Sequence, residues 1–175
     1  MLNEEHLATQ AAAVLDTQQT ELIGAALFEV ALVRNGFEVA QPRRDRGVDL
    51  VVYTDADQQP FNALPVQLKI ANERSFSLDR KYKRKLGLVL AYIWLLPGED
   101  PYFFLMSFDE ALDMLHKGST LDSISWTKNG YYRLAPLDKQ RTAKIQQYRN
   151  RWVWLRQQLS AQSASTPAPI FLPAG

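Results

Sequence analysis

The stretch VDLVVYTDADQQPFNALPVQLK, residues 48–69, decides the fold that this sequence predicts. It predicts two short strands joined by a polar loop. Asp49 opens the first strand, and Gln67 and Lys69 lie on the second. Side chains alternate between the two faces of a strand, so Gln67 and Lys69 share one face while Leu68 points to the other. A carboxylate, an amide and an ammonium at neighbouring strand ends indicate a site rather than a core.

The composition restricts the chemistry of this site. The 175 residues suit one domain with a hydrophobic core, and an apolar fraction of 46% is ordinary for a soluble globular protein. The chain has no cysteine and only two histidines, His6 and His116, which excludes thiolate ligands, cysteine nucleophiles and histidine-rich metal clusters. Its longest apolar run, residues 22–33, is too short to span a bilayer, and no secretory signal is visible. We therefore expect a cytoplasmic protein without a membrane partner.

The net charge of +1 hides an uneven distribution of charged residues. Every Asp, Glu, Lys or Arg before Arg34 is acidic, and three basic clusters follow it. These clusters are Arg43, Arg44 and Arg46; Arg74, Arg80, Lys81, Lys83, Arg84 and Lys85; and Lys139, Arg141, Lys144, Arg149, Arg151 and Arg156. Such clusters can present a positive surface to a polyanion, although a solvated face is the simpler interpretation of any one cluster alone.

The pattern of apolar residues predicts the remaining elements. Helices are expected over residues 4–15, 21–35, 109–116 and 138–159. Strands are expected over residues 37–41, 48–53, 64–71, 86–96 and 102–107, with an edge strand between 119 and 137. The strand at 86–96 is apolar throughout, which is typical of a buried central strand. Residues 72–86 predict irregular structure with one helical turn around 79–85.

The last predicted helix organises the C-terminal part of the chain. One stripe of this helix is apolar and is expected to face the core: Ile145, Tyr148, Trp152, Leu155 and Leu159. Its opposite side is basic. We therefore expect one domain over residues 1–159, with its core at about 21–117 and a C-terminal basic amphipathic helix at about 138–159. Residues 160–175 are rich in Ser, Ala and Pro and are expected to form a flexible tail.

Two positions near the quoted stretch have unusual surroundings. Glu29 is the only polar side chain between Leu22 and Val33, and burying a carboxylate without a partner is costly. It therefore lies at the rim of its helix or serves a function. Gly47 precedes the strand that Asp49 opens, where it permits a backbone conformation or a close approach that a side chain would block.

These residues occur in an order that resembles the PD-(D/E)XK nuclease superfamily. The resemblance rests on the segments FEVALVRNGF, PRRDRGVDLVV and PVQLK and covers about residues 22–107. Within that superfamily the chain looks most like Mrr-type restriction enzymes and Holliday-junction-resolvase-like members, some of which carry glutamine in place of the third acid. The resemblance implies an α/β restriction endonuclease-like fold, with a central mixed β-sheet flanked by helices.

The resemblance also implies a role for each residue of the site. Asp49, Gln67 and Glu29 would provide oxygen ligands for Mg²⁺ or Mn²⁺, and Lys69 would stabilise the negative charge on the reacting phosphate. Arg43, Arg44 and Arg46 lie next to Asp49 and would contact phosphates. The expected activity is that of a metal-dependent DNA endonuclease, acting on branched or foreign DNA. The sequence leaves a homodimer open.

The sequence departs from the superfamily pattern in two places. Gln67 removes one negative charge, which should weaken metal binding, and the helix expected between the third and fourth core strands is short or missing. A catalytically inactive module of the same fold, binding nucleic acid or a protein partner, is therefore the alternative. Taken singly, Asp49 is also explained as a turn cap and Lys69 as a lysine at a strand end.

Overall fold

The computed structural model describes residues 15–44, 46–54, 57, 61–115 and 121–165. The predicted helix at 4–15 lies almost wholly outside these residues, and so do His116 and the predicted tail beyond residue 165. Residues 160–165, which were also predicted to belong to the tail, instead form the end of the last helix. Within the described residues, no helix is both long enough and apolar enough to span a bilayer.

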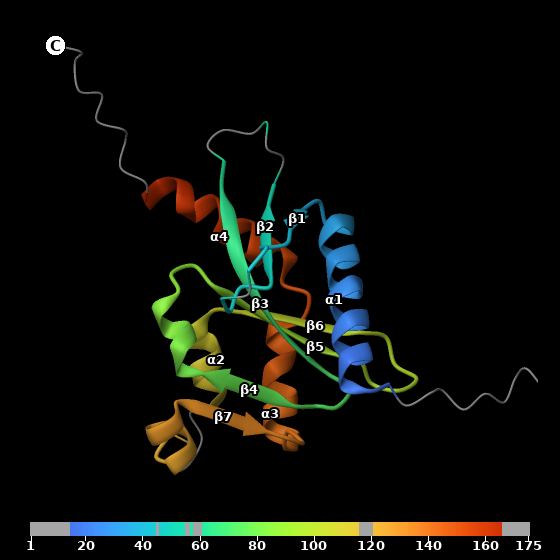
Figure 1. The fold of residues 1–175 in the computed structure, drawn as a ribbon, viewed down its shortest axis with the longest axis vertical. Coiled ribbons are helices and arrows are strands. Elements are labelled where there is room, and N and C mark those ends of the chain that lie inside the picture. Colours follow the sequence, from blue (N-terminus) through green and yellow to red (C-terminus); the bar gives the residue numbers. More distant parts are fainter. Residues whose placement is uncertain (1–14, 45, 55–56, 58–60, 116–120, 166–175) are drawn as a thin grey trace, which may run out of the picture.

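The main sheet has five strands in the order β1-β2-β3-β5-β6. Their bounds are Glu38–Ala40 (β1), Leu50–Tyr53 (β2), Ala63–Ala71 (β3), Val89–Trp94 (β5) and Tyr102–Met106 (β6). Strands β3 and β5 are parallel, and all the other neighbouring pairs are antiparallel. The predicted mixed sheet is therefore confirmed, and each of its strands starts and ends within a few residues of the prediction (Figure 1).

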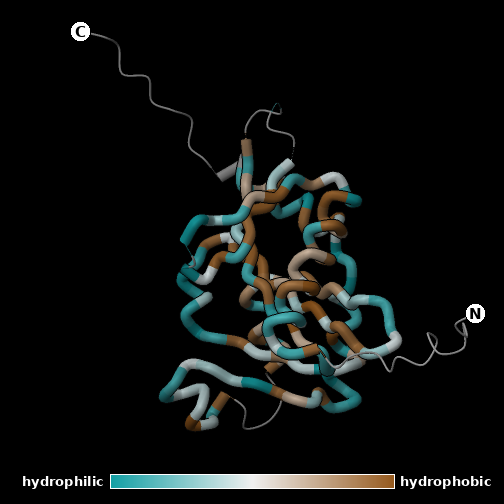
Figure 2. Tube along the Cα trace, turned by 45° about the vertical axis from the view of Figure 1, so that its right-hand side comes forward, coloured by the Kyte–Doolittle hydropathy of each residue, from teal (hydrophilic) through white to brown (hydrophobic). Residues whose placement is uncertain are grey.

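Strand β5 separates two layers of core. All six of its side chains are buried, as the predicted central strand requires. Leu90, Tyr92 and Trp94 pack into one hydrophobic cluster, whereas the alternate residues pack into the other. Figure 2 shows these hydrophobic segments gathered in the interior, with hydrophilic loops around them.

Helices cover both faces of the sheet. On one face, helix α1 (Thr17–Arg34) and helix α4 (Trp152–Ser165) meet, because the ring centroids of Phe28 and Trp152 lie 6.1 Å apart. On the other face lie helix α2 (Phe108–Leu115) and helix α3 (Lys139–Ile145), which contribute buried residues to the cluster that contains Leu90, Tyr92 and Trp94. Sheet, helices and two-layered core together form the α/β architecture that the sequence predicted.

The prediction that residues 72–86 are irregular apart from one helical turn is wrong for residues 76–79. Phe76–Asp79 forms strand β4, which pairs with strand β7 (Tyr131–Leu134) in a separate two-stranded sheet. The predicted helical turn is present as a 3₁₀ helix, η2, over Arg80–Arg84, and the side chain of Asp79 caps it. Strand β4 could not be predicted from the local sequence, because its partner strand lies about fifty residues further along the chain.

The prediction of a single C-terminal helix over residues 138–159 is also wrong. The chain forms α3, a short 3₁₀ turn (Gln146–Tyr148) and then α4, with a break at Asn150, whose φ of 51° lies in the left-handed region. The break turns the predicted apolar stripe from one face of the sheet to the other. Ile145 and Tyr148 join the cluster beneath α2, whereas Leu155 and Leu159 join the cluster beneath α1.

Several cations of the predicted basic helix make contacts within the protein. Arg151 pairs with Glu110 at 2.8 Å and stacks on the ring of Trp154. Arg156 donates to the backbone oxygen of Asn35 at 2.8 Å, and Arg149 lies over the ring of Tyr102. These side chains therefore join the C-terminal segment to α2, to the end of α1 and to β6, so the predicted basic face is not wholly solvated.

Candidate active site

The candidate site lies where strand β2 begins, beside the longer strand β3. The ladder between β2 and β3 ends with Leu50 opposite Val66, and the backbone N–H of Asp49 still donates to the oxygen of Val66 at 2.8 Å. Strand β3 continues alongside β5 to Ala71. Beyond the ladder, the Asp49 carboxylate provides the next acceptor for β3: its Oδ2 accepts from the backbone N–H of Leu68 at 2.6 Å.

Gln67 joins the same carboxylate from the neighbouring strand. Its side-chain Nε2 donates to Asp49 Oδ2, so one oxygen accepts from both an amide side chain and a backbone N–H. The Gln67 side chain is buried, with 8% of its surface exposed. Within the part of the chain that the structure describes, its Oε1 has no hydrogen-bond partner. A buried carbonyl oxygen without a partner is unfavourable by about 1–3 kcal/mol, so it marks a position where a ligand is expected.

Gly47 permits the close approach of two chain segments at this oxygen. Its φ is +74°, and a Cβ at this position would lie 3.4 Å from Gln67 Oε1 and 3.0 Å from Lys85 Nζ. Lys85 Nζ donates to the backbone oxygens of Arg46 and Gly47, the second at 3.0 Å. The role predicted for this glycine is therefore confirmed, and Lys85 fastens the loop that leads to Asp49.

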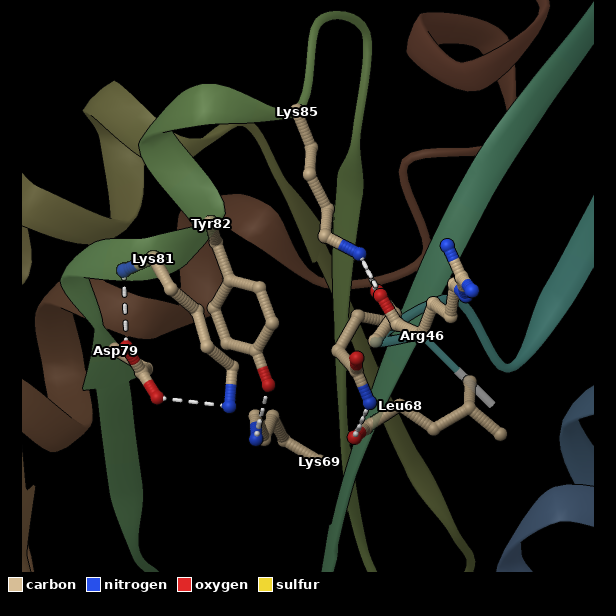
Figure 3. A network of polar contacts seen from close by, with 9 residues as sticks. Arg46, Leu68, Lys69, Asp79, Lys81, Tyr82 and Lys85 are labelled. Atoms are coloured by element: carbon tan, nitrogen blue, oxygen red, sulfur yellow. Dashed lines mark hydrogen bonds and ion pairs between the residues drawn. The ribbon is translucent and has the colours of Figure 1, made fainter. Parts of the chain in front are cut away.

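Lys69 engages a tyrosine that the sequence did not single out. Its Nζ donates to the hydroxyl of Tyr82 at 3.0 Å and lies 5.0 Å from the centre of the ring (Figure 3). Tyr82 belongs to η2 and is only 3% exposed, so its hydroxyl is a fixed acceptor. The signal in the sequence was a single aromatic residue within the charged run RKYKR of residues 80–84.

Glu29 makes its hydrogen bond elsewhere. Its Oε1 accepts from Nε2 of Gln41, the residue that follows β1, at 2.9 Å. The structure thus joins Asp49 to Gln67 directly and places Lys69 two residues further along β3, whereas Glu29 contacts Gln41. Among the described residues, no three His, Asp or Glu side chains form a group that could hold a metal ion.

Two cavities adjoin these residues. One, of about 460 Å³, is lined by Arg46, Gly47, Gln67, Lys81, Tyr82 and Lys85. The other, of about 360 Å³, lies beside Lys69 between the start of α1 and the β4–β7 sheet, with Glu21, Tyr131 and Arg133 among its lining residues. Tyr92 also lines it, and burial raises the pKa of Tyr92 well above its usual value, so its hydroxyl stays protonated and donates to the oxygen of Ser77. Of the three arginines predicted to contact phosphates, Arg46 lines a cavity described here, whereas Arg43 and Arg44 are exposed on the loop.

The donor set fits a hard divalent cation. Asp49 supplies a carboxylate, and Gln67 supplies the buried carbonyl oxygen that lacks a partner. Mg²⁺ and Mn²⁺ favour oxygen ligands of these two kinds over the nitrogen and sulfur ligands that Zn²⁺ favours. Two oxygen-bearing side chains complete only part of a coordination sphere, so water and a substrate oxygen would supply the rest.

Comparison with known proteins identifies the fold. No protein-family model matches the chain, and no curated protein matches it. Its structure is similar to that of the bacterial homing endonuclease I-Ssp6803I, with 19% sequence identity and a TM-score of 0.52 over 87% of this chain and 100% of that one. The Holliday junction resolvase Hjc from Archaeoglobus fulgidus also matches, at 15% identity and a TM-score of 0.41 over 70% of this chain and 87% of that one. The chain therefore has a mixed sheet flanked by helices of the kind found in the homing endonuclease.

Proposed function

We propose that this protein is a metal-dependent nuclease that hydrolyses phosphodiester bonds in DNA. The observation that carries the proposal is the hydrogen bond between Gln67 and Asp49 at the start of β2, with Lys69 two residues further along β3. The fold supports it, because the neighbour of similar architecture is an endonuclease. Branched or foreign DNA is the substrate class that we favour, as the sequence resemblance implies.

Asp49 and Gln67 would hold the metal ion. When bound, Mg²⁺ or Mn²⁺ polarises a phosphate and lowers the pKa of a water molecule in contact with it. The chain prepares Asp49 for this role, because hydrogen bonds from Leu68 N and Gln67 Nε2 fix the orientation of its carboxylate. Glu29 would add a carboxylate from α1, directly or through water, at the expense of its hydrogen bond to Gln41.

Lys69 supplies the positive charge of the proposed site. Its ammonium is held on the hydroxyl and ring of Tyr82, which restricts a side chain that is otherwise flexible. A cation fixed before the substrate arrives stabilises charge that develops on a phosphate without reorganising during the reaction. We therefore assign Lys69 the role of stabilising the transition state and of orienting the attacking water.

One observation favours the non-catalytic alternative. The NH₂ group of Gln67 donates a hydrogen bond to Asp49 Oδ2, an oxygen that a metal ion would otherwise bind. In addition, Gln67 is uncharged at a position where the superfamily that the sequence resembles usually has an acid. A site with one carboxylate fewer binds a cation more weakly. If the metal does not bind at cellular concentrations, the same fold serves as a module that binds nucleic acid or a protein partner.

Cleavage of supercoiled plasmid separates these functions. Wild type, Asp49→Asn, Lys69→Ala and the control Lys83→Ala would be purified in parallel and assayed with Mg²⁺, with Mn²⁺ and with EDTA. We expect nicking by wild type and Lys83→Ala only when a metal is present, and a loss of at least about 100-fold in both site variants. Equal nicking by all four proteins would refute the assigned site. Folded wild-type protein that binds DNA but leaves it intact under every condition would establish the alternative.

A further inference from the structure

The cavity above Gln67 is positively charged. Arg46 and Gly47 form one wall, Lys81, Tyr82 and Lys85 form the other, and Gln67 completes the lining. Of the six lining residues that the structure describes, three are cations and none is an acid. Because one wall belongs to the loop before β2 and the other to η2 and its C-terminal neighbour, the cavity exists only in the folded chain.

The two walls are held together by specific contacts. Lys85 Nζ donates across the cavity to the backbone oxygen of Arg46 (Figure 3) and also to that of Gly47. Lys81 Nζ lies 2.9 Å from Asp79 Oδ2 and 5.2 Å from the centre of the Tyr82 ring, on which Lys69 also rests. Tyr82 therefore contacts both Lys81, a cation of the cavity, and Lys69, the cation of the proposed catalytic site.

We propose that this cavity is a phosphate subsite, which receives a phosphate group of the nucleic acid strand beside the cleavage site. The proposal rests on the proposed nuclease function. Lys81 and Arg46 would bind the phosphate, and Lys85 would maintain the spacing between the walls. The pair between Lys81 and Asp79 leaves 61% of the lysine side chain exposed, and an ion pair so accessible to water is weak. Lys81 therefore exchanges Asp79 for a phosphate, whose oxygens form stronger charge-assisted hydrogen bonds.

Lys83 provides a matched control for Lys81. Both residues belong to η2 and both are exposed, but Lys83 lines other cavities and not this one. DNA affinity would be measured by fluorescence anisotropy between about 50 and 200 mM KCl, with Ca²⁺ in place of Mg²⁺ to prevent cleavage. Each lost phosphate contact lowers the slope of log K against log salt concentration by about 0.9. We expect this decrease for Lys81→Ala and Arg46→Ala, and no change for Lys83→Ala. Equal decreases for Lys81→Ala and Lys83→Ala would mean that DNA senses only the overall charge of η2 and would overturn the subsite.

A second experiment tests the subsite without DNA. Acetylation of lysines in the wild-type protein would be followed by peptide mass spectrometry, with and without inorganic phosphate and with chloride at equal ionic strength. We expect phosphate to slow the acetylation of Lys81 by several-fold and to leave Lys83 unaffected. Protection of Lys81 in a protein that does not bind DNA would retain an anion site and reject the nuclease. Cleavage of DNA without any protection or difference in slope would retain the nuclease and reject the subsite.

Discussion

The side-chain amide of Gln67 donates to the carboxylate of Asp49 and leaves its own carbonyl oxygen buried without a hydrogen-bond partner among the described residues. One end of the amide thus satisfies the acid, while the other end lies beside Gly47, where a Cβ would lie 3.4 Å away. A glutamine is suited to this arrangement because it has both a donor and an acceptor. The proposed nuclease function would use the remaining carbonyl oxygen as a metal ligand.

Replacing Gln67 with glutamate should destabilise the metal-free protein and strengthen its binding of a cation. The substitution would place a second carboxylate within hydrogen-bond distance of Asp49 and remove the side-chain donor that Asp49 now has. In EDTA at neutral pH we expect Gln67→Glu to lower the free energy of unfolding by about 1–3 kcal/mol, measured by urea denaturation. Because a second carboxylate favours the cation, Mg²⁺ should stabilise the variant more than it stabilises wild type. An unchanged response to Mg²⁺ would contradict the proposed role of residue 67 as a ligand.

Removing the hydroxyl of Tyr82 should affect catalysis through Lys69. Tyr82→Phe keeps the ring beneath the ammonium but removes the acceptor at 3.0 Å. We expect kcat to fall by about 10- to 100-fold with little change in KM, because misplacing a reacting group has an effect of this size. In a Lys69→Ala background the same change should have no further effect, since the two residues act as a unit.

Tyr92→Phe is the matched control for this experiment. Tyr92 is also buried in the same cluster, but its hydroxyl donates to the backbone oxygen of Ser77 rather than contacting Lys69. The free energy of unfolding of both variants should lie within about 1.5 kcal/mol of the wild-type value, because one hydrogen bond usually contributes no more than this. If Tyr92→Phe lowers kcat as much as Tyr82→Phe does, the effect comes from the core and not from the positioning of Lys69.

The main sheet could be predicted because each of its strands has a clear pattern of apolar residues within a few adjacent positions. The apolar run of β5 and the alternation around Gln67 and Lys69 each identify a strand from a few adjacent residues. Strand β4 escaped prediction because its stability depends on pairing with β7, and no local pattern records a distant partner. The C-terminal stripe looked continuous because Ile145 and Leu155 have helical spacing on either side of a break. The left-handed backbone at Asn150 leaves no trace in such a pattern.

The candidate site was predictable in its strand residues and less so in its surroundings. Asp49, Gln67 and Lys69 were identifiable because polar side chains at strand ends are unusual, and the structure brings the first two into contact. Tyr82 and Lys85 were not, because their partners Lys69 and Gly47 lie 13 and 38 residues away along the chain. A tyrosine between lysines has many ordinary explanations until its hydroxyl is seen to accept from a lysine of the site.

Substituting Gly47 tests how closely the loop must approach the site. Gly47 and Gly98 have the same φ of +74°, but a Cβ at Gly98 would meet nothing within 4 Å. Gly98→Ala should therefore show the backbone effect alone, a loss of about 1–2 kcal/mol. Gly47→Ala should lose more, because the new methyl group displaces Lys85 from the Gly47 oxygen and crowds Gln67. Equal losses in urea denaturation, with nuclease activity retained in both variants, would show that the loop tolerates a wider spacing.

The role of Glu29 can be decided by comparing it with the exposed Glu38 of β1. The sequence resemblance implies that Glu29 supports the metal ion, whereas the structure shows it accepting from Gln41 at 2.9 Å. If the carboxylate contributes through water, Glu29→Gln should weaken Mn²⁺ binding by about 10-fold, as removal of an outer ligand commonly does, and Glu38→Gln should not. Gln41→Ala removes the competing donor and should leave Mn²⁺ binding as strong as in wild type, or stronger. Calorimetric titration measures all three variants. Identical affinities for Glu29→Gln and wild type would assign Glu29 to the rim of α1, where its contact with Gln41 only joins the helix to β1.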